Sequence, residues 1–172
     1  MDERDVGGYS VAYKRSDIAF PVIAAAIMTV GFSAAAFGSG QPFWLIFAVA
    51  SAAATYHNFP LLETGRPTIG ANQYGMFIQG LGLIGWRSIS RIDLVPVANR
   101  SMTVSQLRIA LAIPMASALV ADWRKRPWHR QLMRLPWNSP APGVIEVALD
   151  PLDQLPGQVH ETLLRMWRYY RS

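Results

Sequence analysis

Two uninterrupted apolar runs lie close together near the start of the chain. The first covers residues 18–37 and the second residues 43–56, and neither contains a charged side chain. A short joint of glycine, serine, glutamine and proline at residues 38–42 separates them. The hydrocarbon core of a bilayer is about 30 Å thick and needs about 20 helical residues, so the first run is long enough to cross it. The pattern predicts a transmembrane helical hairpin over residues 17–62.

Two other interpretations of these runs stay open. Lys14 and Arg15 before the first run are also typical of a secretory signal peptide, although the apolar core of such a peptide is usually about 7–15 residues long. The second run is short if it ends at Tyr56, and it spans a bilayer only if residues 57–62 continue it. A segment that dips into the membrane without crossing it is the alternative for this run.

Basic residues flank the two runs at their outer ends. Lys14 and Arg15 precede the first run, Arg66 follows the second, and the joint between the runs carries no charge. Because positive charges favour the cytoplasmic side, the sequence predicts a multi-pass protein with both termini in the cytoplasm. Residues 1–16 would then form a cytoplasmic N-terminal segment, and residues 63–172 a cytoplasmic domain.

Alternation of apolar and polar positions replaces continuous apolarity after residue 66. Within residues 104–113, for example, Leu107, Ile109 and Leu111 fall on one face of an extended chain. Several short strands with turns between them favour a small antiparallel barrel or sandwich, and hence an α+β or mainly β domain. The predicted strands cover residues 68–71, 74–79, 104–113 and 144–149, and residues 86–94 are predicted to form a helical turn that leads into a strand.

The C-terminal residues follow a helical period. Asp153 is the predicted N-cap of this helix, and Pro156 suits its first turn. We expect the apolar stripe of the helix to pack against the strands. The stripe consists of residues at three- and four-residue spacing, namely Leu155, Val159, Leu163, Met166, Trp167 and Tyr170.

Composition narrows the chemistry that this chain can perform. There is no cysteine, which excludes disulfides, thiolate catalysis and zinc sites built on sulfur. His57, His129 and His160 are not at the spacing of metal ligands on one helix. Neither apolar run carries the charge that a transport path would require. The sequence therefore predicts a protein that is not an enzyme, with no catalytic, cofactor-binding or metal-binding residues.

A glycine pattern at residues 80–85 matches the spacing of a dinucleotide-binding loop. Such a loop would have to open a helix, and an acidic residue would have to follow about 20 positions later. No helical stripe follows this pattern, and no Asp or Glu lies between Asp93 and Asp122. We interpret the pattern as a glycine-rich connection between two strands.

The order of elements resembles that of a known family. The two apolar runs lead into Tyr-Gly-Met-Phe-Ile at residues 74–78, then Leu-Ile-Gly-Trp-Arg-Ser-Ile at residues 83–89, and finally the C-terminal helix. This resembles bacterial membrane proteins that carry a pleckstrin-homology-like (PH-like) domain behind two transmembrane helices. The family pattern is Gly-x-Ile-x-Trp-x-x-Ile, of which the chain keeps Trp86 and Ile89. The resemblance implies an inner-membrane location and a seven-stranded, PH-like antiparallel barrel capped by the C-terminal helix.

The most unusual segment covers residues 122–137, within an expected insertion at residues 114–142. It sets eight basic and tryptophan residues against one acid, Asp122, and we call it the Arg/Trp segment. Anionic lipid headgroups attract basic residues, and tryptophan prefers the membrane interface. Arginine and tryptophan are also enriched in the hot spots of protein interfaces, and nucleic acids bind both. A solvated loop with packed tryptophans is the fourth possibility. The eight residues are Trp123, Arg124, Lys125, Arg126, Trp128, Arg130, Arg134 and Trp137.

Taken together, these patterns predict an interaction or scaffold protein anchored in the bacterial inner membrane. We expect it to be an accessory subunit of a larger membrane complex, in contact with membrane lipids and with integral-membrane partners, and without nucleic acid or a cofactor. The alternative is a PH-like module that binds anionic lipid headgroups through the basic residues of the Arg/Trp segment.

Overall fold

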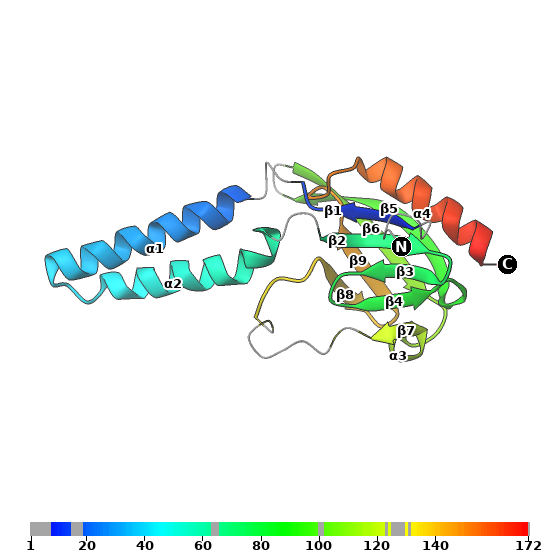
Figure 1. Ribbon diagram of the computed structural model, residues 1–172, viewed down its shortest axis with the longest axis horizontal. Helices are drawn as coiled ribbons and strands as arrows, with labels where there is room; N and C mark the ends of the chain where they lie inside the picture. Colours follow the sequence, from blue (N-terminus) through cyan, green and yellow to red (C-terminus); the bar gives the residue numbers. More distant parts are fainter. Residues whose placement is uncertain are drawn as a thin grey trace, which may run out of the picture. The chain divides into compact units, whose positions relative to one another are not determined.

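The computed structural model describes residues 8–14, 19–62, 66–99, 102–122, 124, 130 and 132–171. The chain divides into two compact units, and each is described by itself (Figure 1). The sheet unit contains Met1–Tyr13, Gly65–Arg126 and Leu135–Ser172. The helical unit contains Lys14–Thr64 and Pro127–Arg134.

The helical unit is built on two antiparallel helices. They are α1 (Ala19–Ser39) and α2 (Trp44–Asn58), and a 3₁₀ turn, η1 (Phe59–Leu62), continues α2. By length and composition, Ala19–Ser39 and Trp44–Leu62 could each cross a membrane. The second apolar run therefore does not stop at Tyr56, because its helical structure continues for six further residues to Leu62.

Small residues line the contact between α1 and α2. Thr29 Oγ1 donates to the carbonyl oxygen of Ala25 (2.8 Å) and lies 3.1 Å from Ser51 Oγ on the facing helix. Such small side chains let two helix backbones approach closely. The buried residues of the pair are Val22, Ala25, Ala36, Ala48 and Ser51.

The sheet unit contains two antiparallel sheets. The first has the strand order β1-β2-β3-β4-β7, and the second has the order β5-β6-β9-β8. A 3₁₀ turn, η2 (Trp86–Ser88), leads from the first sheet into the second, and the short helix α3 (Met115–Ala118) precedes β7. The strands are β1 (Tyr9–Ala12), β2 (Pro67–Asn72), β3 (Gly75–Ile78), β4 (Gly82–Gly85), β5 (Ile89–Asn99), β6 (Met102–Leu111), β7 (Leu119–Asp122), β8 (Trp137–Ala141) and β9 (Val144–Ala148).

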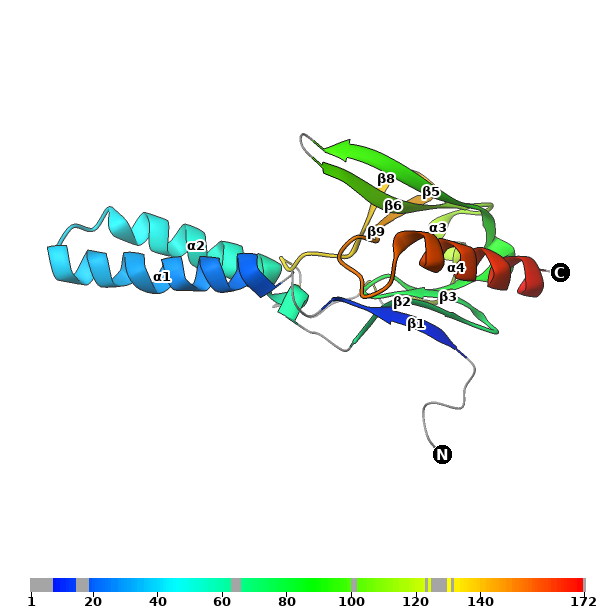
Figure 2. The ribbon, with the colours of Figure 1, turned by 90° about the horizontal axis from the view of Figure 1, so that it is seen from above.

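Helix α4 (Pro156–Tyr170) lies between the two sheets, and Figure 2 shows it between β6 of one sheet and β2 of the other. The indole N–H of Trp167 donates to the carbonyl oxygen of Ile89 at the start of β5 (3.1 Å). The chain thus has an α plus β fold with the predicted C-terminal helix. The core comes from both sheets and from α4, and includes Ile69, Ile78, Leu107, Ile109, Ile145, Val159 and Leu163.

The predicted N-cap of α4 is wrong. Leu155 occupies the N-cap position with an extended backbone, and no side chain caps the helix. Asp153 lies earlier, where its backbone N–H donates to the carbonyl oxygen of Ala12 in β1 (3.0 Å). Pro156 lies in the first turn, as predicted, where its missing N–H costs nothing.

Strand β1 precedes the helical pair in sequence but belongs to the sheet unit. Val11 is buried and pairs with Ile69 of β2. The hydroxyl of Tyr9 donates to Gln154 Oε1 (2.5 Å), and burial, followed by the charge of Asp153, raises the pKa of Tyr9. The sequence had instead predicted a separate segment over residues 1–16. A four-residue strand such as β1 is too short to show its alternating period in the sequence.

The expected insertion at residues 114–142 also contributes to the sheets. β7 forms one edge of the first sheet beside β4, and β8 forms one edge of the second beside β9. The pattern of residues did not predict β8, because this strand contains Pro140 and polar residues, which a strand tolerates at a sheet edge. The structure thus adds β1, β4, β7 and β8 to the strands expected from the sequence.

The glycine pattern at residues 80–85 opens no long helix, but only its first two residues form the connection expected from the sequence, because Gly82–Gly85 is strand β4. Gly80 and Gly82 both have positive φ angles, +73° and +131°, at the turn between β3 and β4. The three-residue turn η2 follows Gly85, so no long helix begins there.

Two glycine-to-alanine substitutions test the packing of the sheet unit. A Cβ at Gly75 would clash with the backbone carbonyl of Ile84 on β4, so we expect Gly75→Ala to lower the free energy of unfolding by about 1–3 kcal/mol. A Cβ at Gly157 in α4 meets no atom within 4 Å, so Gly157→Ala should leave that free energy unchanged or raise it by up to about 1 kcal/mol.

Urea unfolding of the full chain in detergent, followed by tryptophan fluorescence, measures both effects. Equal unfolding midpoints for the two variants would contradict the register between β3 and β4.

Candidate functional site

Arg124 of the Arg/Trp segment binds its own acidic neighbour. Its guanidinium forms a fork on the Asp122 carboxylate, with Nε 2.9 Å from Oδ1 and Nη2 2.6 Å from Oδ2. The backbone N–H of Arg124 donates to the same carboxylate (2.9 Å). The hydrogen bond from Arg124 to Asp122 raises the pKa of the guanidinium. The charge of Arg124 is therefore already paired with that of Asp122, which makes Arg124 a poor candidate for binding a lipid headgroup.

Four of the eight predicted site residues lie outside the described residues. They are Trp123, Lys125, Arg126 and Trp128. Their contact with a lipid or a partner stays a prediction.

The later part of the Arg/Trp segment belongs to the helical unit. The backbone N–H of Arg134 donates to the carbonyl oxygen of His57 (2.9 Å), near the end of α2. The Nδ1 atom of His57 lies 2.7 Å from the carbonyl oxygen of Leu132. Because a carbonyl can only accept, Nδ1 must carry the proton. These two bonds form what we call the His57 clamp, which holds residues 132–134 to the end of α2.

No pattern of residues in the sequence predicts the His57 clamp. His57 and Leu132 are 75 positions apart, and both bonds use backbone carbonyl groups, which leave no residue signature. The clamp leaves the side chains of Leu132 and Arg134 exposed. It brings the backbone of Arg134 to the end of α2.

Trp137, the last residue of the Arg/Trp segment, is part of the sheet unit. It opens β8 and pairs with Val147 of β9. Its indole nitrogen is buried and has no hydrogen-bond partner among the described residues. These contacts favour a packing role for Trp137 in the sheet unit.

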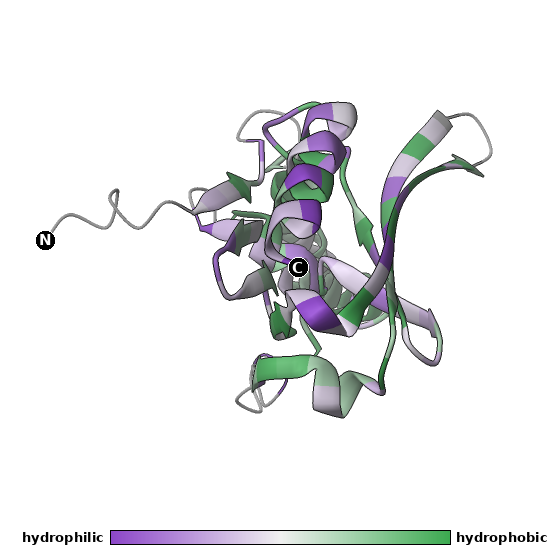
Figure 3. Ribbon diagram, turned by 90° about the vertical axis from the view of Figure 1, so that its right-hand side faces the viewer, coloured by the Kyte–Doolittle hydropathy of each residue, from purple (hydrophilic) through white to green (hydrophobic). Residues whose placement is uncertain are grey.

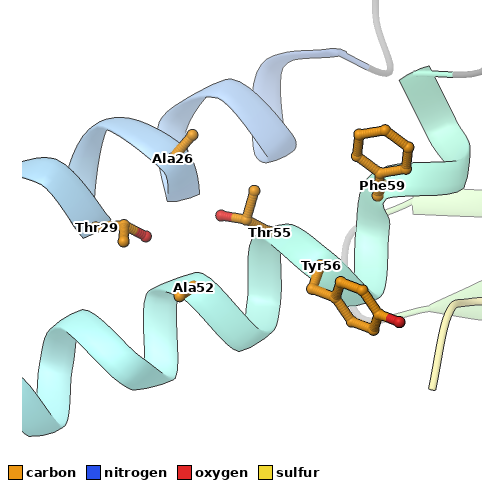
Figure 4. A pocket seen from close by; sticks show the side chains of 6 residues that line it. All are labelled: Ala26, Thr29, Ala52, Thr55, Tyr56 and Phe59. Atoms are coloured by element: carbon orange, nitrogen blue, oxygen red, sulfur yellow. The ribbon is translucent and has the colours of Figure 1, made fainter. Parts of the chain in front are cut away.

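A groove lies within the helical unit between α1 and α2 (Figure 4). Its volume is about 310 Å³. The hydroxyl of Thr29 donates to Ala25 and that of Thr55 donates to Ser51 (2.9 Å), both to backbone carbonyl groups. Since both hydroxyls are satisfied within their own helices, the groove suits an apolar occupant. Its lining consists of Ala26, Thr29, Ala52, Thr55, Tyr56 and Phe59.

Within the described part of the chain, no group of three or more His, Cys, Asp or Glu side chains could hold a metal ion. No family model, curated protein or solved structure matches the sequence or the structure. The PH-like domain implied by the resemblance therefore stays a prediction.

The His57 clamp can be tested by limited proteolysis of the full chain in lipid nanodiscs. His57→Ala removes the donor to Leu132, so trypsin should cleave after Arg134 roughly two- to tenfold faster, as expected for one net hydrogen bond. His57→Asn keeps a side-chain N–H close to the position of Nδ1, and should cleave at nearly the wild-type rate. Equal rates for the alanine variant and the wild type would show that the clamp does not form.

Proposed function

We propose that this chain is a membrane-anchored interaction protein that serves as an accessory subunit of a larger complex in the bacterial inner membrane. The supporting observation is the outer surface of the helical unit. Large apolar side chains there are highly exposed, including Phe37 at 84%, Val30 at 70% and Ile46 at 70%. A continuous apolar surface of this kind is unfavourable in water and favourable in lipid or against other membrane helices.

The pairing of β1 with β2 supports a fixed orientation for this anchor. One strand precedes the helical pair and the other follows it, so both ends of the pair return to the same sheet unit. The sheet unit therefore lies on one side of the membrane in this proposal, and the basic residues Lys14 and Arg66 favour the cytoplasmic side.

Short connections keep the sheet unit near the membrane surface in this proposal. Six residues, 13–18, join β1 to α1, and four residues, 63–66, join η1 to β2. Even a fully extended chain of six residues spans at most about 20 Å. A domain on such tethers stays within reach of lipid headgroups and of the cytoplasmic parts of neighbouring subunits.

The groove between α1 and α2 supports contact with a further membrane helix. Its small and hydroxyl-bearing residues would let a third helix approach closely, as they do at the contact of α1 with α2. Two helices alone leave most of their apolar surface for lipid or for partners. An accessory subunit that packs its hairpin against a larger partner would make use of that surface.

One observation favours the alternative function, which is binding to anionic lipid headgroups. The His57 clamp holds Arg134 at the end of α2, which is the depth of the headgroups if α2 crosses the bilayer. A basic residue near that surface is attracted by about 1 kcal/mol. We place this function second, because Arg124 in the same segment is already compensated by Asp122.

Purification from native membranes tests the proposed complex. The tagged full chain, extracted in mild detergent, should retain one or more integral-membrane proteins in fixed stoichiometry. The variant Ala26→Leu/Ala52→Leu fills the groove and should lose most of the retained partner, because a third helix can no longer approach. The matched control, Ala34→Leu/Ala50→Leu, adds the same bulk at exposed positions outside the groove and should retain it.

A monodisperse wild-type monomer after such extraction would contradict the proposed complex. Equal recovery of partners with both double variants would instead exclude the groove as the contact.

A further inference from the structure

The end of α4 carries a cluster of aromatic and arginine side chains that the proposed anchor does not use. The rings of Trp86 and Tyr170 stack with centroids 6.2 Å apart and an interplanar angle of 13°. Tyr169 meets Tyr170 edge-on at 4.8 Å, and the guanidinium of Arg171 lies 4.7 Å above the ring of Trp167. These side chains come from η2, from α4 and from Arg171 directly after it, and Figure 3 looks onto the end of the sheet unit where α4 terminates.

Hydrogen bonds hold the base of this cluster. The indole of Trp86 donates to the carbonyl oxygen of Asn72 (2.8 Å), and that of Trp167 donates to Ile89 (3.1 Å). Both tryptophans are almost fully buried, at 3% and 9% exposure. The cluster is therefore held in place before any partner binds, which lowers the entropic cost of association.

Three arginines lie along the exposed side of the end of α4, beside this cluster. Arg165, Arg168 and Arg171 recur every third residue and are all exposed, whereas Leu163 and Trp167 on the other side are buried. In the described part of the chain, no carboxylate forms an ion pair with any of the three. One cation would be enough to complement the dipole at the helix end, so the other two are in excess of that role.

We propose that this surface, formed by Arg165, Arg168, Tyr169 and Arg171, binds an acidic segment of a partner protein. The inference rests on the proposed function, since it names the chemistry of one partner of the accessory subunit. Guanidinium groups bind carboxylates with paired hydrogen bonds, and arginine and tyrosine are the residues most often found at the centre of protein interfaces. Arg171 is already held by stacking on Trp167, so less freedom is lost when it binds.

Two other kinds of partner fit this surface less well. A bilayer would accept inserted aromatic rings, but Trp86 and Trp167 are buried and Tyr170 is stacked between its neighbours. A nucleic-acid base would need an open ring face, and the same packing covers these faces. Tyr169 is 73% exposed and meets Tyr170 edge-on.

Fluorescence anisotropy with a labelled deca-glutamate peptide tests the proposal on the full chain in neutral phosphatidylcholine nanodiscs. We expect saturable binding that weakens as salt is added. Arg165→Ser/Arg168→Ser/Arg171→Ser should weaken binding by about tenfold or more, since three exposed ion pairs are lost together. The control Arg66→Ser/Arg91→Ser/Arg108→Ser removes the same charge elsewhere in the sheet unit and should change the affinity by less than about twofold.

A single charge reversal, Arg168→Glu, covers the case in which the triple variant fails to fold. This exposed position tolerates the change, and binding should fall several-fold while the unfolding midpoint stays the same. Three results would overturn the proposal: no binding of the peptide to the wild type, equal loss in the triple variant and its control, or tighter binding of oligo-deoxythymidine or of phosphatidylglycerol vesicles through the same arginines.

The outcomes separate this inference from the proposed function. A chain that retains membrane partners but does not bind the peptide refutes the acidic partner alone. A chain that binds the peptide through these arginines but purifies as a monomer refutes the membrane complex alone.

Discussion

The backbone pairing of β1 with β2 is the constraint on which the rest of the architecture depends. Tyr9–Ala12 and Pro67–Asn72 lie on either side of the helical pair, yet they form adjacent strands. Closing so long a loop costs entropy, although that cost grows only slowly with length. The antiparallel packing of α1 on α2 removes much of it, because η1 contacts both helices and so brings the end of the pair back towards its start. Both ends of the helical pair therefore connect to adjacent strands of one sheet.

The Arg/Trp segment connects the two sheets and also contributes residues to the helical unit. The Arg/Trp segment leaves the first sheet after β7, gives residues 127–134 to the helical unit, and returns as β8 at the edge of the second sheet. The two hydrogen bonds of the His57 clamp hold residues 132–134 to α2. The segment is thus divided among three roles, since Asp122 compensates Arg124, the clamp positions Arg134, and Trp137 packs in β8.

Strong local patterns predicted much of the fold, and weak ones did not. The apolar runs, the alternation around Leu107 and Ile109, and the stripe through Val159 and Leu163 are long enough to show their period, and each corresponds to a helix or strand. β1 and β8 are four or five residues long and owe their conformation to partners far away in sequence. For the same reason the sequence did not predict the His57 clamp, in which the His57 ring meets a backbone carbonyl group 75 positions away. Asp153 is not the N-cap because α4 begins later than predicted, with Leu155 at the N-cap position.

The central claim is that α1 and α2 cross the membrane and leave the sheet unit on the cytoplasmic side. The absence of cysteine allows single reporter cysteines to be placed at will. Ser39→Cys lies at the joint between the helices, and Ser139→Cys lies on the exposed edge strand β8. A membrane-impermeant maleimide applied to spheroplasts should label position 39 at once, and position 139 only after lysis. Labelling of position 139 in intact spheroplasts, or protection of position 39, would contradict the account.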